Sequence, residues 1–248
     1  MTSAQEPFPV SIQRLRGAFG ALGRAMLDLL LPIACGGCGR EGDLFCSACR
    51  ASTPMMPAPR CPHCDRPLPA GDARCFQCAR RPLRHLAGLR TDYAYSGPLR
   101  RAILALKYHS LHALAEPLGE LLVATWERRR LSVDLVVPIP LHQRRERSRG
   151  FNQAALLSRL VASDCGLPIA ADGLVRLRDT PPQARAADEQ ARQAQVAGAF
   201  AARSDMAGQT VLLVDDVCTT GATLDAAALA CHAAGARQVW GLVLARTL

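Results

Sequence analysis

Two adjacent carboxylates and the hydroxyl-rich loop after them form the stretch most able to do chemistry. Asp215 and Asp216 follow the apolar run 211–214, which is typical of a strand buried on both faces. An Ala-rich helical run begins at Leu224. Strand, loop and helix in this order present backbone N–H groups and a helix dipole to a phosphate, while carboxylates suit sugar hydroxyls or Mg²⁺. The predicted ligand contacts are Asp215, Asp216, Thr219, Thr220, Gly221, Ala222 and Thr223.

The same stretch has two other interpretations. One is an ordinary strand–helix unit with a threonine-rich turn. The other is the Walker-B-like strand of a P-loop NTPase, which requires a partner G-x-x-x-x-G-K-[ST]. The chain has one lysine, Lys107, and Tyr108 follows it, so that partner is missing. Lys107 lies between predicted helices 99–106 and 111–130. Its compact ammonium is expected to contact phosphate or pyrophosphate, with a solvated side chain as the alternative.

A basic segment follows a second predicted strand, 133–138, and leads into a predicted helix, 153–162. Ligands of open α/β sheets bind beyond the carboxyl ends of the strands, so this segment offers a second phosphate locus. The side chains expected to meet pyrophosphate there are Arg144, Arg145 and Arg149. The alternative is a solvated basic loop.

Eight of the 11 cysteines fall in four C-x-x-C pairs within one short span. Two such knuckles complete a tetrahedral four-sulfur site, so the span predicts two structural zinc ions. No export signal is visible, which makes disulfides the weaker interpretation. Sequential pairing gives the ligand sets Cys35, Cys38, Cys46 and Cys49, then Cys61, Cys64, Cys75 and Cys78. Crossed pairing and a rubredoxin-like iron site stay open.

Several motifs then point to a known family. The stretch 211–223 closely resembles the loop of type I phosphoribosyltransferases that binds phosphoribosyl pyrophosphate (PRPP). Pro-Ile-Pro-Leu-His at 138–142 and Arg-x-x-x-Arg-Gly-Phe-Asn-Gln at 145–153 resemble the ComF family, also called competence protein F-like. Leu-Lys-Tyr at 106–108 and Thr-Pro-Pro-Gln at 180–183, with Arg192 after it, fit the same family. Gln195 departs from it, since an asparagine is common there.

The resemblance carries expectations about fold and function. Members resemble amidophosphoribosyltransferases and carry an N-terminal double zinc ribbon. The resemblance implies that the chain binds PRPP with Mg²⁺ and acts in natural competence. The partners it implies are single-stranded DNA and proteins of the competence machinery. The alternative is a working phosphoribosyltransferase that transfers ribose 5-phosphate to an unknown nucleobase or amine.

Composition supports anionic partners. The net charge is +9 and the sequence pI about 9.3, as expected of a protein that meets phosphates, nucleotides or nucleic acid. Only 4% of residues are aromatic, which limits base stacking. The apolar stretches are too short for a transmembrane helix, and a cytoplasmic location is expected. Residues 11–31 have the spacing of an amphipathic helix, which would pack on a neighbouring domain or lie on a membrane surface.

The predicted organisation has three parts. Residues 1–34 hold the N-terminal helix, 35–86 the double zinc ribbon and 87–248 a type I phosphoribosyltransferase-like α/β domain. That domain should have a mainly parallel sheet with helices on both faces. We expect the ribbon and the α/β domain to have separate cores, so that losing a zinc ligand such as Cys46 leaves PRPP binding largely intact.

Overall fold

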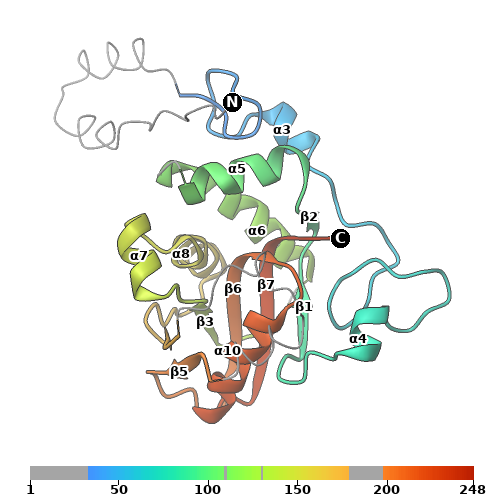
Figure 1. Cartoon of the computed structure of the whole chain (residues 1–248), viewed down its shortest axis with the longest axis vertical. Helices are drawn as coiled ribbons and strands as arrows, with labels where there is room; N and C mark the ends of the chain where they lie inside the picture. Colours follow the sequence, from blue (N-terminus) through green and yellow to red (C-terminus); the bar gives the residue numbers. More distant parts are fainter. Residues whose placement is uncertain (1–32, 109–110, 130, 179–197) are drawn as a thin grey trace, which may run out of the picture.

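The computed structural model describes residues 33–108, 111–129, 131–178 and 198–248. Its centre is a sheet in which every strand pair is parallel (Figure 1). The strand order is β1 (Gly88–Arg90), β7 (Gln238–Arg246), β6 (Thr210–Cys218) and β3 (Leu135–Pro138). The short strand β2 (Tyr93–Ala94) pairs with the same edge of β7 as β1 does, farther along β7. This is the predicted fold class.

β6 is buried on both faces because helices cover both faces of the sheet. Val211 and Leu213 join the core under α10 (Ala222–Ala233), whereas Leu212 and Val214 join the opposite core. The helices that supply the opposite core are α5 (Gly97–Tyr108), α6 (Ala115–Arg129), with the short 3-10 helix η1 (His112–Leu114) before it, and α8 (Gln153–Cys165). The predicted apolar run therefore forms a strand with two buried faces.

Two elements differ from the sequence-based expectation. The stretch 88–95, expected to be one strand, forms the two short strands β1 and β2, because the N–H of Thr91 donates to Asp65 Oδ2 at 3.0 Å instead of pairing in the sheet. The segment expected to be a basic loop contains the helix α7 (Gln143–Arg149). The side chain of His142 accepts from the N–H of Arg144 at its start, and Gly150 ends it with a φ of +84°.

A small antiparallel pair joins β4 (Leu174–Arg176) to β5 (Phe200–Ala202) outside the main sheet. The family residues at 180–183, 192 and 195 fall in the sequence between these two strands. Residues 179–197 lie outside the described residues, as does the predicted helix 11–31.

The expectation of separate cores is wrong. The ribbon segment contributes two short helices, α3 (Ser47–Ala51) and α4 (Phe76–Arg80). Its cysteines are shared between the two cores of the sheet: Cys35, Cys46 and Cys49 pack with α5 and α6, while the four from Cys61 to Cys78 pack with α10. The ribbon has too few large apolar residues to bury alone and packs on the larger domain instead.

No helix among the described residues is long and apolar enough to cross a bilayer.

Candidate phosphate site and metal centres

The loop between β6 and α10 turns at Gly221, which has a φ of +91° and caps α10. A side chain is strained at this angle. An added Cβ would also lie 2.9 Å from Leu83 Cδ2. Thr220 Oγ1 accepts from the N–H of Ala222 at 3.3 Å. The first N–H groups of α10 therefore lie at the carboxyl end of β6, which is the arrangement that favours a phosphate.

Lys107 reaches the carboxylates at this end of β6. Its Nζ lies 2.8 Å from Asp216 Oδ1, so α5 places the only lysine of the chain beside the loop. Burial opposes the charge, but Asp216 and Asp215 outweigh it and the pKa of Lys107 is raised. Asp216 is itself buried, and its Oδ2 has no hydrogen-bond partner among the described residues. An unpaired buried carboxylate oxygen is costly and suits a ligand or cation.

Asp215 lies at the same end of β6, and the pKa of its carboxyl group is raised. Burial raises its pKa to about 7, the charge of Asp216 adds to the rise, and Lys107 opposes it. The two acids were expected at the carboxyl end of the strand, and β6 continues two residues past them to Cys218. Beyond the acids the alternation slips by one residue: Val217 packs with the α5 core and Cys218 with the α10 core. The side chains after the two carboxylates therefore face the opposite sides of the sheet from those that strict alternation would give.

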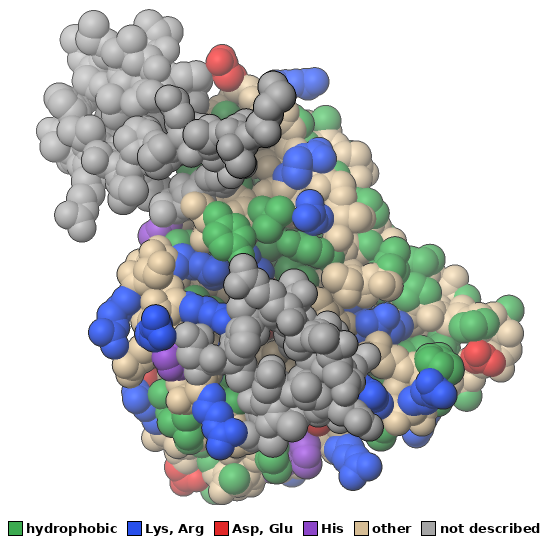
Figure 2. Space-filling model, viewed as in Figure 1, with side chains coloured by type: hydrophobic (Ala, Val, Ile, Leu, Met, Phe, Trp, Pro, Cys, Tyr) green, Lys and Arg blue, Asp and Glu red, His purple; other side chains and the backbone are tan. Residues whose placement is uncertain are grey.

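The predicted pyrophosphate arginines lie on α7. Arg149 stacks over the ring of Tyr108 at 5.5 Å, next in sequence to Lys107, and it also contacts Gln153 Oε1. Arg144 is exposed and Arg145 half-buried in the first turn of the helix. Figure 2 shows Lys and Arg side chains gathered over α7 at the left of this view. The N-terminus of α8, expected as a second anion site, is capped by Asn152, whose Oδ1 accepts from Ala154 N at 3.0 Å.

The eight paired cysteines form two four-sulfur groups in sequential pairing. We name Cys35, Cys38, Cys46 and Cys49 cluster 1, and Cys61, Cys64, Cys75 and Cys78 cluster 2; within each, all sulfurs lie within 4.8 Å of one another. The Sγ atoms of Cys35 and Cys49 are 3.7 Å apart, and those of Cys64 and Cys75 are 3.5 Å apart. Zinc with tetrahedral bonds of about 2.3 Å would separate its sulfurs by about 3.8 Å, so both clusters fit structural zinc.

The thiols within a cluster perturb one another strongly. In cluster 2 the hydrogen bond from Cys78 lowers the pKa of Cys64 to about 4, and the same bond, with burial, raises the pKa of Cys78. Four sulfurs at this spacing cannot all ionise unless a cation offsets their charge. The donor set is therefore that of a closed zinc site rather than of four independent thiols.

The other three cysteines belong to neither cluster. Cys218 and Cys231 are buried in the α10 core, as small apolar residues would be. Cys165 is half-buried and packs against the opposite core.

Two arginines link cluster 2 to the phosphate loop, a contact that the sequence alone did not predict. Arg66 Nη2 donates to the carbonyl of Thr219 at 2.8 Å, and Arg246 Nη2 donates to the same carbonyl at 3.3 Å. Arg246 Nη1 also donates to the carbonyl of Cys64 at 3.0 Å. The one available signal was Arg246 itself, a cation at the end of an apolar strand, because a buried charge requires partners.

These features define a class of protein: a phosphoribosyltransferase-type α/β domain joined to a double zinc ribbon. Two family matches agree, "Phosphoribosyl transferase domain" over residues 147–247 and "Double zinc ribbon domain" over residues 26–79.

The "DNA utilization protein YhgH" of Escherichia coli (strain K12) is 31% identical over 225 residues, 88% of this chain and 95% of that protein. "Competence protein F" of Haemophilus influenzae is 28% identical, over 81% of this chain and 90% of the relative. "Competence protein ComFC" of Bacillus subtilis is also 28% identical, over 76% and 78% of the two chains. The chain belongs to the ComF family.

Among solved structures, the glutamine PRPP amidotransferase of B. subtilis, complexed with ADP and GMP, aligns with a TM-score of 0.36 and 22% identity. The alignment covers 52% of this chain and 26% of the amidotransferase.

Proposed function

We propose that the chain binds PRPP, or a nucleotide sharing its ribose 5-phosphate, at the carboxyl end of β6. The observation that carries this proposal is the unpaired, buried Asp216 Oδ2 beside the loop that opens α10. A carboxylate oxygen at that place suits a ribose hydroxyl, or Mg²⁺ held among phosphates.

The loop residues divide the ligand among them. The backbone of Thr219, Thr220, Gly221, Ala222 and Thr223, with the threonine hydroxyls, would hold the 5-phosphate through charge-assisted hydrogen bonds. Asp215 and Asp216 would meet the ribose hydroxyls with Mg²⁺ nearby.

Lys107 would meet the pyrophosphate from α5, and Arg149 from the adjacent end of α7. Arg149 stacks on Tyr108, the residue after Lys107, which brings the two cations to neighbouring helix ends and supports this assignment. Arg144 and Arg145 would extend the positive charge along α7.

Calorimetry with PRPP and Mg²⁺ tests the site. Wild type should bind PRPP more tightly than ribose 5-phosphate, because the monophosphate lacks the pyrophosphate contacts. Thr220→Val removes one donor and should weaken PRPP binding about 10-fold, the lower end of the effect of one charge-assisted hydrogen bond. A folded wild type that does not bind PRPP would rule the site out.

We propose further that the chain acts in DNA uptake and use, in the cytoplasm where thiols stay reduced. The names of its relatives support the role, and α7, which has no buried residues, supplies basic side chains for single-stranded DNA. Binding to single strands should weaken with salt at a log–log slope of about −0.7 per phosphate neutralised. Arg144→Ala with Arg145→Ala should make the slope shallower, whereas Arg237→Ala, an exposed arginine just before β7, should not.

Turnover is the second candidate, favoured by the raised pKa of Asp215. A base with a pKa near 7 is suited to accept a proton at neutral pH. A nitrogen of a nucleobase or amine would attack the anomeric carbon as its bond to pyrophosphate breaks, and its proton would pass to Asp215. Pyrophosphate release from PRPP, measured across such acceptors, tests this; release no faster than without protein would exclude it.

A further inference from the structure

The carbonyl of Thr219 accepts from two arginines that lie far apart in the sequence. Arg66 comes two residues after Cys64 of cluster 2, and its own carbonyl accepts from the N–H of Cys61 at 2.7 Å. Arg246 ends β7 and is 1% exposed. One carbonyl in the predicted phosphate loop is therefore held from the metal centre, with Arg246 spanning Cys64 and Thr219 through its two terminal nitrogens.

Two guanidinium groups so close together require nearby negative charge, because Arg246 is buried and Arg66 is half-buried. A zinc ion with four thiolates carries a net charge of −2. Cluster 2 is buried at all four cysteines and lies beside both arginines. A zinc-loaded cluster 2 would therefore neutralise the two guanidinium groups. This neutralisation would stabilise both arginines in their hydrogen bonds to the Thr219 carbonyl.

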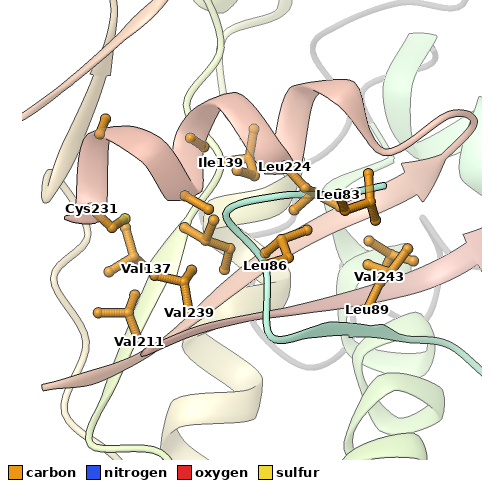
Figure 3. Close-up of a cluster of buried hydrophobic side chains, with 14 of the residues drawn as sticks. Leu83, Leu86, Leu89, Val137, Ile139, Val211, Leu224, Cys231, Val239 and Val243 are labelled. Atoms are coloured by element: carbon orange, nitrogen blue, oxygen red, sulfur yellow. The ribbon is translucent and has the colours of Figure 1, made fainter. Parts of the chain in front are cut away.

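A second set of contacts joins the same two regions through the segment after α4. Figure 3 shows Leu83 against Leu224 at the start of α10, and Leu86 between α10 and the sheet. The N–H of His85 donates to Asp225 Oδ1 at 2.8 Å, in the first turn of α10. This segment also lies over Gly221, since Leu83 is the side chain that an added Cβ would meet.

We propose that Arg66 and Arg246 are positioning residues for the phosphate loop and that the zinc of cluster 2 is their counter-ion. Zinc in cluster 2 then controls the geometry of Thr219–Gly221, and with it the affinity for PRPP, whereas zinc in cluster 1 does not. The affinity part of this inference rests on the proposed function. The loop geometry does not, and it can be measured without any ligand.

The test uses the full-length, zinc-loaded protein and compares Arg66→Ala with Arg101→Ala. Arg101 is a matched control, because its Nε donates to the carbonyl of Gly37 in cluster 1. Zinc content, PRPP affinity with Mg²⁺ and hydrogen exchange of the backbone amides at 217–222 are measured on both. Arg66→Ala should keep two zinc ions, speed exchange at 217–222 and weaken PRPP binding about 2- to 12-fold.

Arg101→Ala should leave both the exchange and the affinity at wild-type values. Arg66→Lys keeps the positive charge and should lie between wild type and Arg66→Ala, which a purely steric role would not predict. Wild-type exchange in Arg66→Ala, or equal acceleration in Arg66→Ala and Arg101→Ala, would overturn the inference. A wild type that binds no PRPP would contradict the proposed function. The comparison of hydrogen exchange would still show whether Arg66 positions the phosphate loop.

Discussion

The two zinc clusters have the same donor atoms and nearly the same sulfur spacing, but they contact different parts of the α/β domain. Cluster 1 lies against α5 and η1: Arg101 holds the carbonyl of Gly37, and an added Cβ on Gly36 would meet Leu114 at 2.8 Å. Cluster 2 lies against the carboxyl ends of β6 and β7, where two arginines share the carbonyl of Thr219. One cluster therefore contacts the scaffold and the other contacts the predicted site.

The difference shows that a structural metal can act at two levels in one chain. Both ions allow a polar, cysteine-rich segment to pack, because each cluster is part of a core shared with the sheet. Among the described contacts, only cluster 2 is also linked, through Arg66 and Arg246, to the loop on which a phosphate would lie. Stability should depend on both metals, but ligand binding should depend mainly on one.

Replacing one ligand in each cluster gives the largest expected effect. Wild type should contain two zinc ions per chain by elemental analysis. Cys64→Ser and Cys46→Ser should each lose one and lower the melting temperature by about 10 °C or more, since the metal is coupled to folding. Cys64→Ser should also abolish PRPP binding, whereas Cys46→Ser should retain it. Equal PRPP affinity in the two variants would contradict the different roles of the two clusters. A wild-type zinc content near one would contradict the presence of two zinc sites.

Gly221 and Gly166 separate backbone strain from contact with the ribbon. Both glycines have positive φ, but an added Cβ at Gly166 meets nothing within 4 Å. Gly166→Ala should therefore lower the free energy of unfolding by about 1–2 kcal/mol through strain alone. Gly221→Ala should lower the free energy of unfolding by about 1–3 kcal/mol more than Gly166→Ala does, because Leu83 must move. Denaturant unfolding measures both, and similar losses would show that the segment carrying Leu83 yields without cost.

Asp216 and Asp134 compare the two ends of the sheet. Asp216→Asn keeps the shape but removes a charge-assisted acceptor worth about 1.5–3 kcal/mol, so PRPP affinity should fall roughly 10- to 150-fold. Asp134 accepts from the N–H of Thr210 at the start of β6, and its side chain is half-exposed. Asp134→Asn should leave PRPP affinity unchanged in calorimetry. A comparable loss in both variants would mean that the carboxyl end of β6 has no special role.

Asp215 gives an effect that depends on pH. Burial raises its pKa from an ordinary 3.8 to about 7 in the folded state. The folded chain then binds this proton more tightly than the unfolded chain, so stability is full below about pH 4 and is lost as pH rises to about 7. Asp215→Asn should therefore gain melting temperature over wild type across this window and level off above it.

The control for this pH dependence is Asp172→Asn, because the carboxylate of Asp172 is exposed. It should show no such trend. A constant difference between Asp215→Asn and wild type from pH 4 to 8 would contradict the raised pKa.

Local patterns were enough to predict the parallel sheet and both zinc ligand sets. Four apolar residues at 211–214 can only be buried on two faces, and C-x-x-C knuckles fix sulfur positions within a few residues. The contacts of Arg66 and Arg246 with Thr219 could not be predicted, because they join residues 153 and 27 positions apart.

α7 was missed for a different reason. Its seven residues bury none of their side chains, so no apolar period marks the helix. Its signals were local instead, in the capping side chain of His142 and the positive φ of Gly150.

A crystal structure of the zinc-loaded chain with PRPP and Mg²⁺ is the decisive experiment for the site at the carboxyl end of β6. The 5-phosphate should lie on the N–H groups of the loop from Thr219 to Thr223. A ribose hydroxyl or Mg²⁺ should lie within about 3 Å of Asp216 Oδ2, with Arg66 and Arg246 still on the Thr219 carbonyl. Ligand bound elsewhere while this loop and Asp216 Oδ2 stay without it would contradict the proposed site.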